Sequence, residues 1–105
     1  MKLLTKAILN SFPEWHSLRK PNEVVKVIVK FFCPWNDWAW YAVEFDGEDT
    51  FFGFVHGDFP ELGYFSLSEM ESVTGPLGLK IERDMHFGNH TLKEVMKRSA
   101  EGRRL

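Results

Sequence analysis

The stretch from Pro34 to Gly57, PWNDWAWYAVEFDGEDTFFGFVHG, constrains the fold of this chain more than any other part. It carries three tryptophans, one tyrosine and four phenylalanines within 24 residues. Pro34 to Asp37 has the composition of a turn, and Asp46-Gly47 can adopt the positive φ angles of a tight hairpin turn. The stretch therefore predicts two strands, Trp38–Phe45 and Thr50–His56, each preceded by a turn.

Both predicted strands are largely apolar on each of their two faces. Side chains alternate along a strand, so one face of the first strand carries Trp38 and Trp40 while the other carries Tyr41 and Phe45. A strand of this kind is either covered on both sides or covered on one side and open to a partner on the other. Gly53, in the second strand, is expected to let a neighbouring ring or backbone lie close.

Signals outside this stretch complete an α+β pattern. Alternating apolar residues, turn residues and capping boxes predict the other elements. These are strands at Val24–Phe32, Gly63–Ser66 and Leu79–Phe87, and helices capped by Thr5, by Ser66 or Ser68, and by Thr91. The connecting turns are too short for parallel crossovers. We therefore predict a mainly antiparallel four- to five-stranded meander sheet with two or three short flanking helices.

The 105 residues are predicted to form one α+β domain. The composition, 44% hydrophobic and 27% charged, is ordinary for a folded globule and unlike that of a disordered chain. The tail from Ser99 to Leu105 is polar and is expected to fray.

Cysteine usage and apolar run lengths bear on localisation. Cys33 is the only cysteine, so neither an intramolecular disulfide nor a zinc site of several cysteines can form. Lys6 and Asn10 interrupt the apolar start, and no small-residue cleavage site follows as it would in a signal peptide. No segment approaches the length of a membrane span. We expect a cytoplasmic protein without membrane association.

Three segments resemble a known bacterial family. They are KFFCPWNDWAWYAVEFDGEDTFFGFVHG, ELGYFSLSEMESV and GPLGLKIERD, and they resemble the family called domain of unknown function 2958. Cys33, His56 and Gly88-Asn89-His90 follow no motif of that family. The matching residues are Trp40-Tyr41, Glu44 to Gly47, Glu61 to Phe65 and Ile81 to Asp84. The resemblance implies a small stand-alone protein of plasmids, phages and integrative elements, with no established activity.

Two histidine arrangements are candidates for metal binding. His56, Asp58 and Glu61 place three metal-competent side chains around one turn, but their spacing matches no metal-binding geometry. His86 and His90 are four residues apart, yet a zinc pair at that spacing needs a helix, which the intervening glycine and asparagine break. We predict no catalytic residue, no metal and no cofactor.

The aromatic residues carry the leading functional hypothesis. Aromatic side chains rimmed by charge are typical of protein interfaces, and these strands supply more rings than two short helices readily cover. Stacking on single-stranded nucleic acid wants basic flanks, whereas these flanks are acidic. We expect a non-enzymatic module that binds another protein through an aromatic sheet face and acidic turns. The expected binding residues are Trp35, Trp38, Trp40, Asp46, Glu48, Asp49, Glu61, Tyr64 and Arg83.

A small metal-assisted hydrolase or nuclease is the first alternative. Asp46, Asp49, Glu82 and Asp84 could meet in space around Mg²⁺, which prefers oxygen ligands, with His56 nearby. Three convergent acidic oxygens would favour that enzyme. A flat exposed aromatic patch without a concave pocket would favour protein binding.

Nucleic-acid binding is the second alternative, through Lys26, Lys30 and the Arg103-Arg104 tail. Both lysines are expected on the more polar face of the strand at Val24–Phe32, opposite its valines. A net charge of −2 disfavours this function, because nucleic-acid binding normally needs a basic face.

Overall fold

Five strands form a single antiparallel sheet in the computed structural model, which describes residues 2–17 and 24–105. The strands are β1 (Val29–Phe32), β2 (Ala39–Phe45), β3 (Thr50–His56), β4 (Glu61–Ser66) and β5 (Glu82–Arg83). Their order across the sheet is β4-β3-β2-β1-β5, and each neighbouring pair is antiparallel. The predicted α+β class and meander are confirmed, and β1 is the neighbour of the fifth strand.

Three short helices accompany the sheet, and each begins where a side-chain cap was predicted. They are α1 (Lys6–Leu9), α2 (Leu67–Ser72) and α3 (Leu92–Ala100), with a 3-10 turn η2 (Pro76–Gly78) between α2 and β5. The hydroxyl oxygens of Thr5, Ser66 and Thr91 accept hydrogen bonds from backbone N–H groups of their first turns. Within residues 2–17 and 24–105, no helix combines the length and apolar character that crossing a membrane requires.

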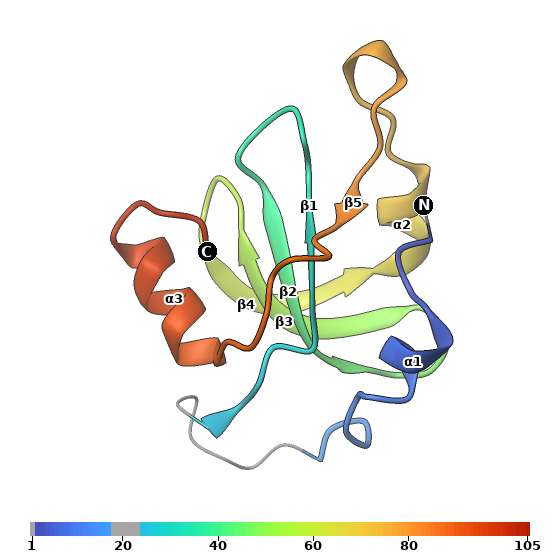
Figure 1. Ribbon diagram of the computed structural model, residues 1–105, viewed down its shortest axis with the longest axis vertical. Coiled ribbons are helices and arrows are strands. Elements are labelled where there is room, and N and C mark those ends of the chain that lie inside the picture. Colours follow the sequence, from blue (N-terminus) through green and yellow to red (C-terminus); the bar gives the residue numbers. More distant parts are fainter. Residues whose placement is uncertain (1, 18–23) are drawn as a thin grey trace.

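The helices lie on opposite faces of the sheet, with α3 on one side and α1 and α2 on the other (Figure 1). We call these sides the α3 face and the α2 face. On the α3 face, Leu92 and Val95 pack with residues of the central strands. On the α2 face, Met70 packs with Phe31 and Phe51. Helices pack on both faces of the sheet. This explains why the central strands carry apolar side chains on both of their sides.

A bulge in β2 breaks the predicted alternation. The register with β3 shifts between Ala42 and Glu44, so Phe45 lies on the α2 face rather than on the face of Tyr41. The prediction for Phe45 is therefore wrong, because a bulge inserts one residue and reverses the side chains beyond it. A Cβ atom at Gly53 would overlap the carbonyl group of Tyr41, which confirms the predicted close approach.

Two predicted strands are longer than the observed ones. The segment Leu79–Phe87 pairs with β1 at Glu82 and Arg83, and the Asp84 N–H adds one bond to the Lys30 carbonyl at 3.0 Å. Its chain then turns away, where the Asp84 side chain accepts a hydrogen bond from the His86 N–H at 2.9 Å. The segment Val24–Phe32 enters the sheet at Val29, after the Val27 N–H has bonded to the His90 carbonyl at 3.0 Å. Alternation alone does not reveal where pairing stops.

Lys30 departs from the polar face on which it was expected. Only 5% of the residue is exposed. Its ammonium lies 3.3 Å from an Asp84 carboxylate oxygen and donates to the Leu105 carbonyl at 2.9 Å. Burial lowers the pKa of Lys30 although Asp84 acts to raise it. The partners that permit this burial come from residues 54 and 75 positions further along the chain.

The tail that was expected to fray packs against the sheet. Ser99 is buried in α3, and its hydroxyl oxygen lies 2.7 Å from Nδ1 of His56. Arg104 donates to the carbonyl groups of Asn36 at 3.2 Å and Trp38 at 3.4 Å. The tail thereby reaches the connection between β1 and β2.

Candidate binding pocket

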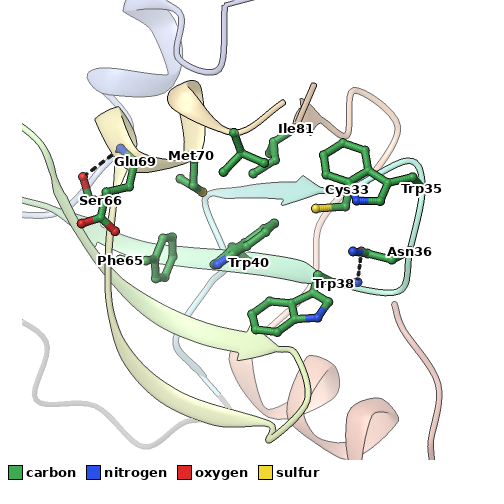
Figure 2. A pocket seen from close by; sticks show the side chains of 11 residues that line it. Cys33, Trp35, Asn36, Trp38, Trp40, Phe65, Ser66, Glu69, Met70 and Ile81 are labelled. Carbon is green, nitrogen blue, oxygen red and sulfur yellow. Dashed lines mark hydrogen bonds between the residues drawn. The ribbon is translucent and has the colours of Figure 1, made fainter. Parts of the chain in front are cut away.

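The connection between β1 and β2 and the start of β2 bring three tryptophans together on the α2 face (Figure 2). Trp35, Trp38 and Trp40 are each half-buried. The rings of Trp38 and Trp40 have centroids 5.8 Å apart and planes inclined at 41°. Asn36 shapes the turn, because its side-chain oxygen accepts the Trp38 N–H at 2.9 Å, as expected for asparagine in a turn.

A cavity of about 380 Å³ lies among these tryptophans, α2 and the chain that leads into β5. Figure 2 shows Met70 and Ile81 on one side of the cavity and Trp38 on the opposite side. The volume lies within the range of sites that hold a small molecule or a partner's side chain. The lining residues are Cys33, Trp35, Asn36, Trp38, Trp40, Phe65, Ser66, Glu69, Met70, Val73 and Ile81.

Two glycines support two of the indoles. A Cβ atom added at Gly75 would lie 2.6 to 2.7 Å from three carbons of the Trp35 ring. One added at Gly57 would lie 2.7 to 2.9 Å from three carbons of the Trp38 ring. Nearly equal distances to three ring atoms mean that each glycine lies over a ring face rather than beside its edge. Both indoles are therefore fixed on one face by backbone that only glycine allows so close.

A series of hydrogen bonds from the α3 face holds the turn that carries the tryptophans. The Asp37 carboxylate lies 3.0 Å from Nε2 of His56 and 3.8 Å from Nε of Arg104. His56 is in turn bonded to Ser99 of α3. The backbone of Asn36 and Trp38 receives further hydrogen bonds from Arg104. The pocket wall is thus tied to α3 and the tail.

Ser99, His56 and Asp37 are the residue types of a nucleophilic triad and are bonded in that sequence. The exposure of the serine and the carboxylate, however, is the reverse of what a triad requires. Ser99 is 7% exposed, whereas the Asp37 side chain is 73% exposed. A triad needs an accessible serine and a buried carboxylate that orients the histidine. The arrangement therefore serves as a structural link.

The lining of the pocket carries one acidic residue and no basic one. Glu69 is the only Asp, Glu, Lys, Arg or His residue in the lining, and it is exposed. Burial raises the pKa of the Cys33 thiol, which keeps that side chain neutral. Residues 31–79 hold nine of the 15 acidic residues of the chain and none of its 13 lysines and arginines. The acidic residues of this segment favour a cation at the site, and Arg104, bonded to the backbone of Asn36 and Trp38, is a basic group near it.

The acidic turn predicted to bind has a structural role. Asp46 accepts backbone N–H groups of Glu48, Asp49 and Thr50 at 2.8 to 3.0 Å, and these bonds lower its pKa. Asp49 accepts the Ser66 hydroxyl at 2.5 Å and the Ser68 N–H at 2.8 Å, which lower its pKa. These two carboxylates fix the β2–β3 loop and join it to the start of α2. Glu48 is exposed.

The other predicted binding residues do not line the pocket. Tyr64 pairs with Phe52 and contacts the ring of Trp15, on the side of the sheet opposite Phe65. Glu61 is exposed at the start of β4. Arg83 donates to the Lys2 carbonyl at 2.6 Å. The predicted set is thus spread over both faces, so it does not form the single surface that the sequence suggested.

The carboxylates of the metal hypothesis do not meet. Asp46 and Asp49 lie in the β2–β3 loop, whereas Glu82 lies in β5 and Asp84 pairs with Lys30. Throughout the part of the chain that the structure describes, no three His, Cys, Asp or Glu side chains come together in a way that could hold a metal ion. The geometry therefore gives no support to metal-assisted hydrolysis.

Sequence reasoning identified the tryptophans but missed most of the other lining residues. Phe65 and Ile81 fall in predicted strands, but the sequence did not predict that they share a pocket, or that Gly57 and Gly75 lie against indole rings. Met70, which is 4% exposed, points inward from α2. A glycine beneath an indole leaves no local signal in the sequence. Gly57 is 19 positions from Trp38, and Gly75 is 40 positions from Trp35.

Comparisons with known proteins give a family but no activity. Residues 4–102 match the family described as a protein of unknown function, DUF2958. The matched range contains every residue that lines the pocket. No curated protein and no solved structure matches the chain.

Proposed function

Because the chain belongs to the DUF2958 family, whose function is unknown, we propose a function from the pocket. The protein binds another protein by taking one of that protein's side chains between Trp35, Trp38 and Trp40. The tryptophans do not form the flat exposed patch that the sequence analysis associated with protein binding. The observation that carries the proposal is instead that these three rings stay half-buried around a cavity of about 380 Å³. Partly exposed tryptophans around a pocket are the usual centre of a protein interface.

The preorganisation of the pocket supports this proposal. Gly57 and Gly75 fix two of the indoles, and Arg104 fixes the turn that carries them. A wall that is already ordered before binding loses little conformational entropy when a ligand arrives. The acidic segment 31–79 would also steer a basic partner toward the site and speed association.

Nucleic acid fits the geometry less well than protein. Lys30, one of the cations of that hypothesis, is buried and paired with Asp84, so it cannot contact phosphate. Arg104 is engaged with the β1–β2 turn. The acidic pocket would repel a polyanion.

The biological setting is proposed from the family resemblance alone. We infer that the protein is a bacterial, cytoplasmic accessory protein of a plasmid, phage or integrative element. A basic host protein would suit the acidic pocket, and an inhibitor of host defence would fit that setting. Recovery of a defence protein as the partner would support this setting, and recovery of a housekeeping protein alone would contradict it.

An affinity capture with matched variants tests the function. The immobilised full chain is compared with the double variant Trp38→Ala/Trp40→Ala, and with Phe59→Ala as the control. Phe59 is 82% exposed and lies outside the pocket lining, so this control removes an exposed ring without changing the site. We expect the partner to be retained by wild type and Phe59→Ala and lost from the double variant.

A second variant covers the possibility that the double variant unfolds. Val73→Trp keeps all pocket tryptophans and adds a ring at a lining residue that is 38% exposed. We expect it to fold and to lose the partner because the cavity is filled. Equal capture by wild type and by folded Val73→Trp would refute the proposed function.

A further inference from the structure

We propose that the group taken into the pocket is a cation, namely the ammonium of a lysine or the guanidinium of an arginine on the partner protein. This inference rests on the proposed function and specifies its ligand. Its basis is the pairing of three indoles with one carboxylate, Glu69, in a lining without a basic residue.

The indoles supply the first part of the site. Tryptophan is the aromatic residue that attracts cations most strongly, because its ring face carries negative charge density. Gly75 covers one face of the Trp35 ring, and Gly57 covers one face of the Trp38 ring. The rest of each ring surface is available to a group bound in the cavity. The same chemistry already operates inside this protein, where the Lys30 ammonium lies 5.7 to 5.9 Å from three ring centroids.

Glu69 supplies the second part. It lies in the first turn of α2 and belongs to the pocket lining, where Figure 2 shows it at the end next to Ser66 and Phe65, opposite the end that carries Trp35. Across residues 2–17 and 24–105, no cation forms an ion pair with this carboxylate. An unpaired carboxylate at one end of an aromatic pocket is complementary to an ammonium or guanidinium group that enters the pocket and unfavourable for an anion.

The apolar lining fits the stem of such a side chain. Lysine and arginine have three or four methylene groups that bury against apolar surface while the charged end stays near polar groups. Met70 and Ile81, at the side of the cavity opposite Trp38, can contact the stem (Figure 2). A wholly apolar side chain would use the same contacts but would gain nothing from Glu69. These two occupants therefore differ in a way that can be measured.

The test uses matched probes of equal shape. The full chain, with its tryptophans labelled for indole N–H NMR, is titrated with N-acetyl-arginine amide and with N-acetyl-citrulline amide. Citrulline keeps the size and shape of arginine and lacks the charge. N-acetyl-lysine amide and N-acetyl-norleucine amide form a second pair. We expect the cationic member of each pair to shift the pocket indoles and to bind at least about fivefold more tightly than the neutral one.

Two variants of α2 separate Glu69 from general acidity. Glu69→Gln is expected to weaken arginine-amide binding by about threefold to tenfold and to leave citrulline-amide binding unchanged. Glu71→Gln is the control, because Glu71 is exposed on the same helix and does not line the pocket. It should leave both affinities unchanged.

Three results would overturn the cation proposal. These are equal or tighter binding of the neutral probes, equal effects of Glu69→Gln and Glu71→Gln, or no indole shift with any probe. None of them decides the proposed function, which stands or falls on the capture experiment. Neutral probes that bind better would instead identify an apolar side chain as the occupant of the same pocket.

Discussion

The two faces of the sheet share the same strands but are covered in different ways. On the α3 face, Tyr41, Phe54 and Val95 are all less than 5% exposed and belong to a buried core. On the α2 face, Phe31 and Phe51 are fully buried, yet the three tryptophans beside them surround a cavity. The difference lies in the covering helices. The nine-residue α3 buries Leu92, Val95 and Ser99, whereas the six-residue α2 buries Met70 alone.

This difference separates stability from binding. A helix of six residues is about 9 Å long and cannot cover a sheet face. The β1–β2 turn therefore places its indoles over the remaining surface, on glycine supports. The α3 face should carry the larger share of the folding free energy, and the tryptophan side of the α2 face should carry the affinity for a ligand. The variants below test that division.

The largest expected effect comes from truncating one ring on each face. Phe54→Ala should lower the free energy of unfolding by about 3–5 kcal/mol, because it removes a ring that is 4% exposed from the core. Trp35→Ala should cost less than about 2 kcal/mol, because this ring is half-buried at a cavity. Urea unfolding measures both. A Trp35→Ala cost equal to that of Phe54→Ala would contradict the division.

Glycine substitutions sharpen the comparison. Gly53→Ala should destabilise by about 1–3 kcal/mol or more, because the new methyl group meets the Tyr41 backbone, which cannot move aside. Gly75→Ala should cost less, because the Trp35 ring can tilt into the cavity, and it should change tryptophan fluorescence. Denaturation and emission spectra of both variants check this. The reverse ranking of stabilities would show that the cavity is not available to the ring.

The next largest effect is expected for Lys30, on the α3 face, and it concerns the pH dependence of stability. Burial lowers its pKa in the folded protein below the ordinary value of 10.5, so the unfolded chain binds the proton more tightly. Stability should therefore rise with pH between the lowered pKa and 10.5. Lys30→Met should lack this contribution and show a flatter alkaline profile. Parallel profiles for wild type and variant, from urea unfolding at several pH values, would refute the assignment.

The smallest effect is expected at the half-buried Asp49, which joins the β2–β3 loop to α2. Bonds from Ser66 and Ser68 lower its pKa from the ordinary 3.8, so its contribution is present above that pH and lost as pH falls through the lowered value. Asp49→Asn should therefore be slightly less stable at neutral pH, with the difference shrinking in acid. A difference that stays constant down to the acid limit would mean that ionisation of Asp49 does not contribute.

Local signals made much of the fold predictable from the sequence. The bounds of β3, Thr50–His56, follow from alternation between two turns and agree with the structure. The capping box of Thr91 and Glu94 is likewise local, and both of its hydrogen bonds are present. The inward position of Met70 follows from helical spacing after Ser66. Such features involve residues close together in the chain, so their residue types are sufficient.

The remaining features depend on contacts between distant residues. The bulge in β2 and the burial of Lys30 depend on partners in β3, in the segment after β5 and in the tail. The tryptophan cluster could be recognised by composition, but the cavity requires Gly75 and Ile81 to come back over the sheet. The position of Tyr64 could have been inferred, because alternation places it on the opposite side from Phe65.

The most direct test of the account is NMR mapping of the two faces with the captured partner bound. The probes are the indole N–H groups of the tryptophans and the methyl groups of Val95 and Leu92. We predict that the partner shifts the signals of Trp35, Trp38 and Trp40 and leaves the α3-face methyl groups unchanged. Shifts at the α3 face with unchanged pocket indoles would contradict the claim that the tryptophan pocket is the binding site.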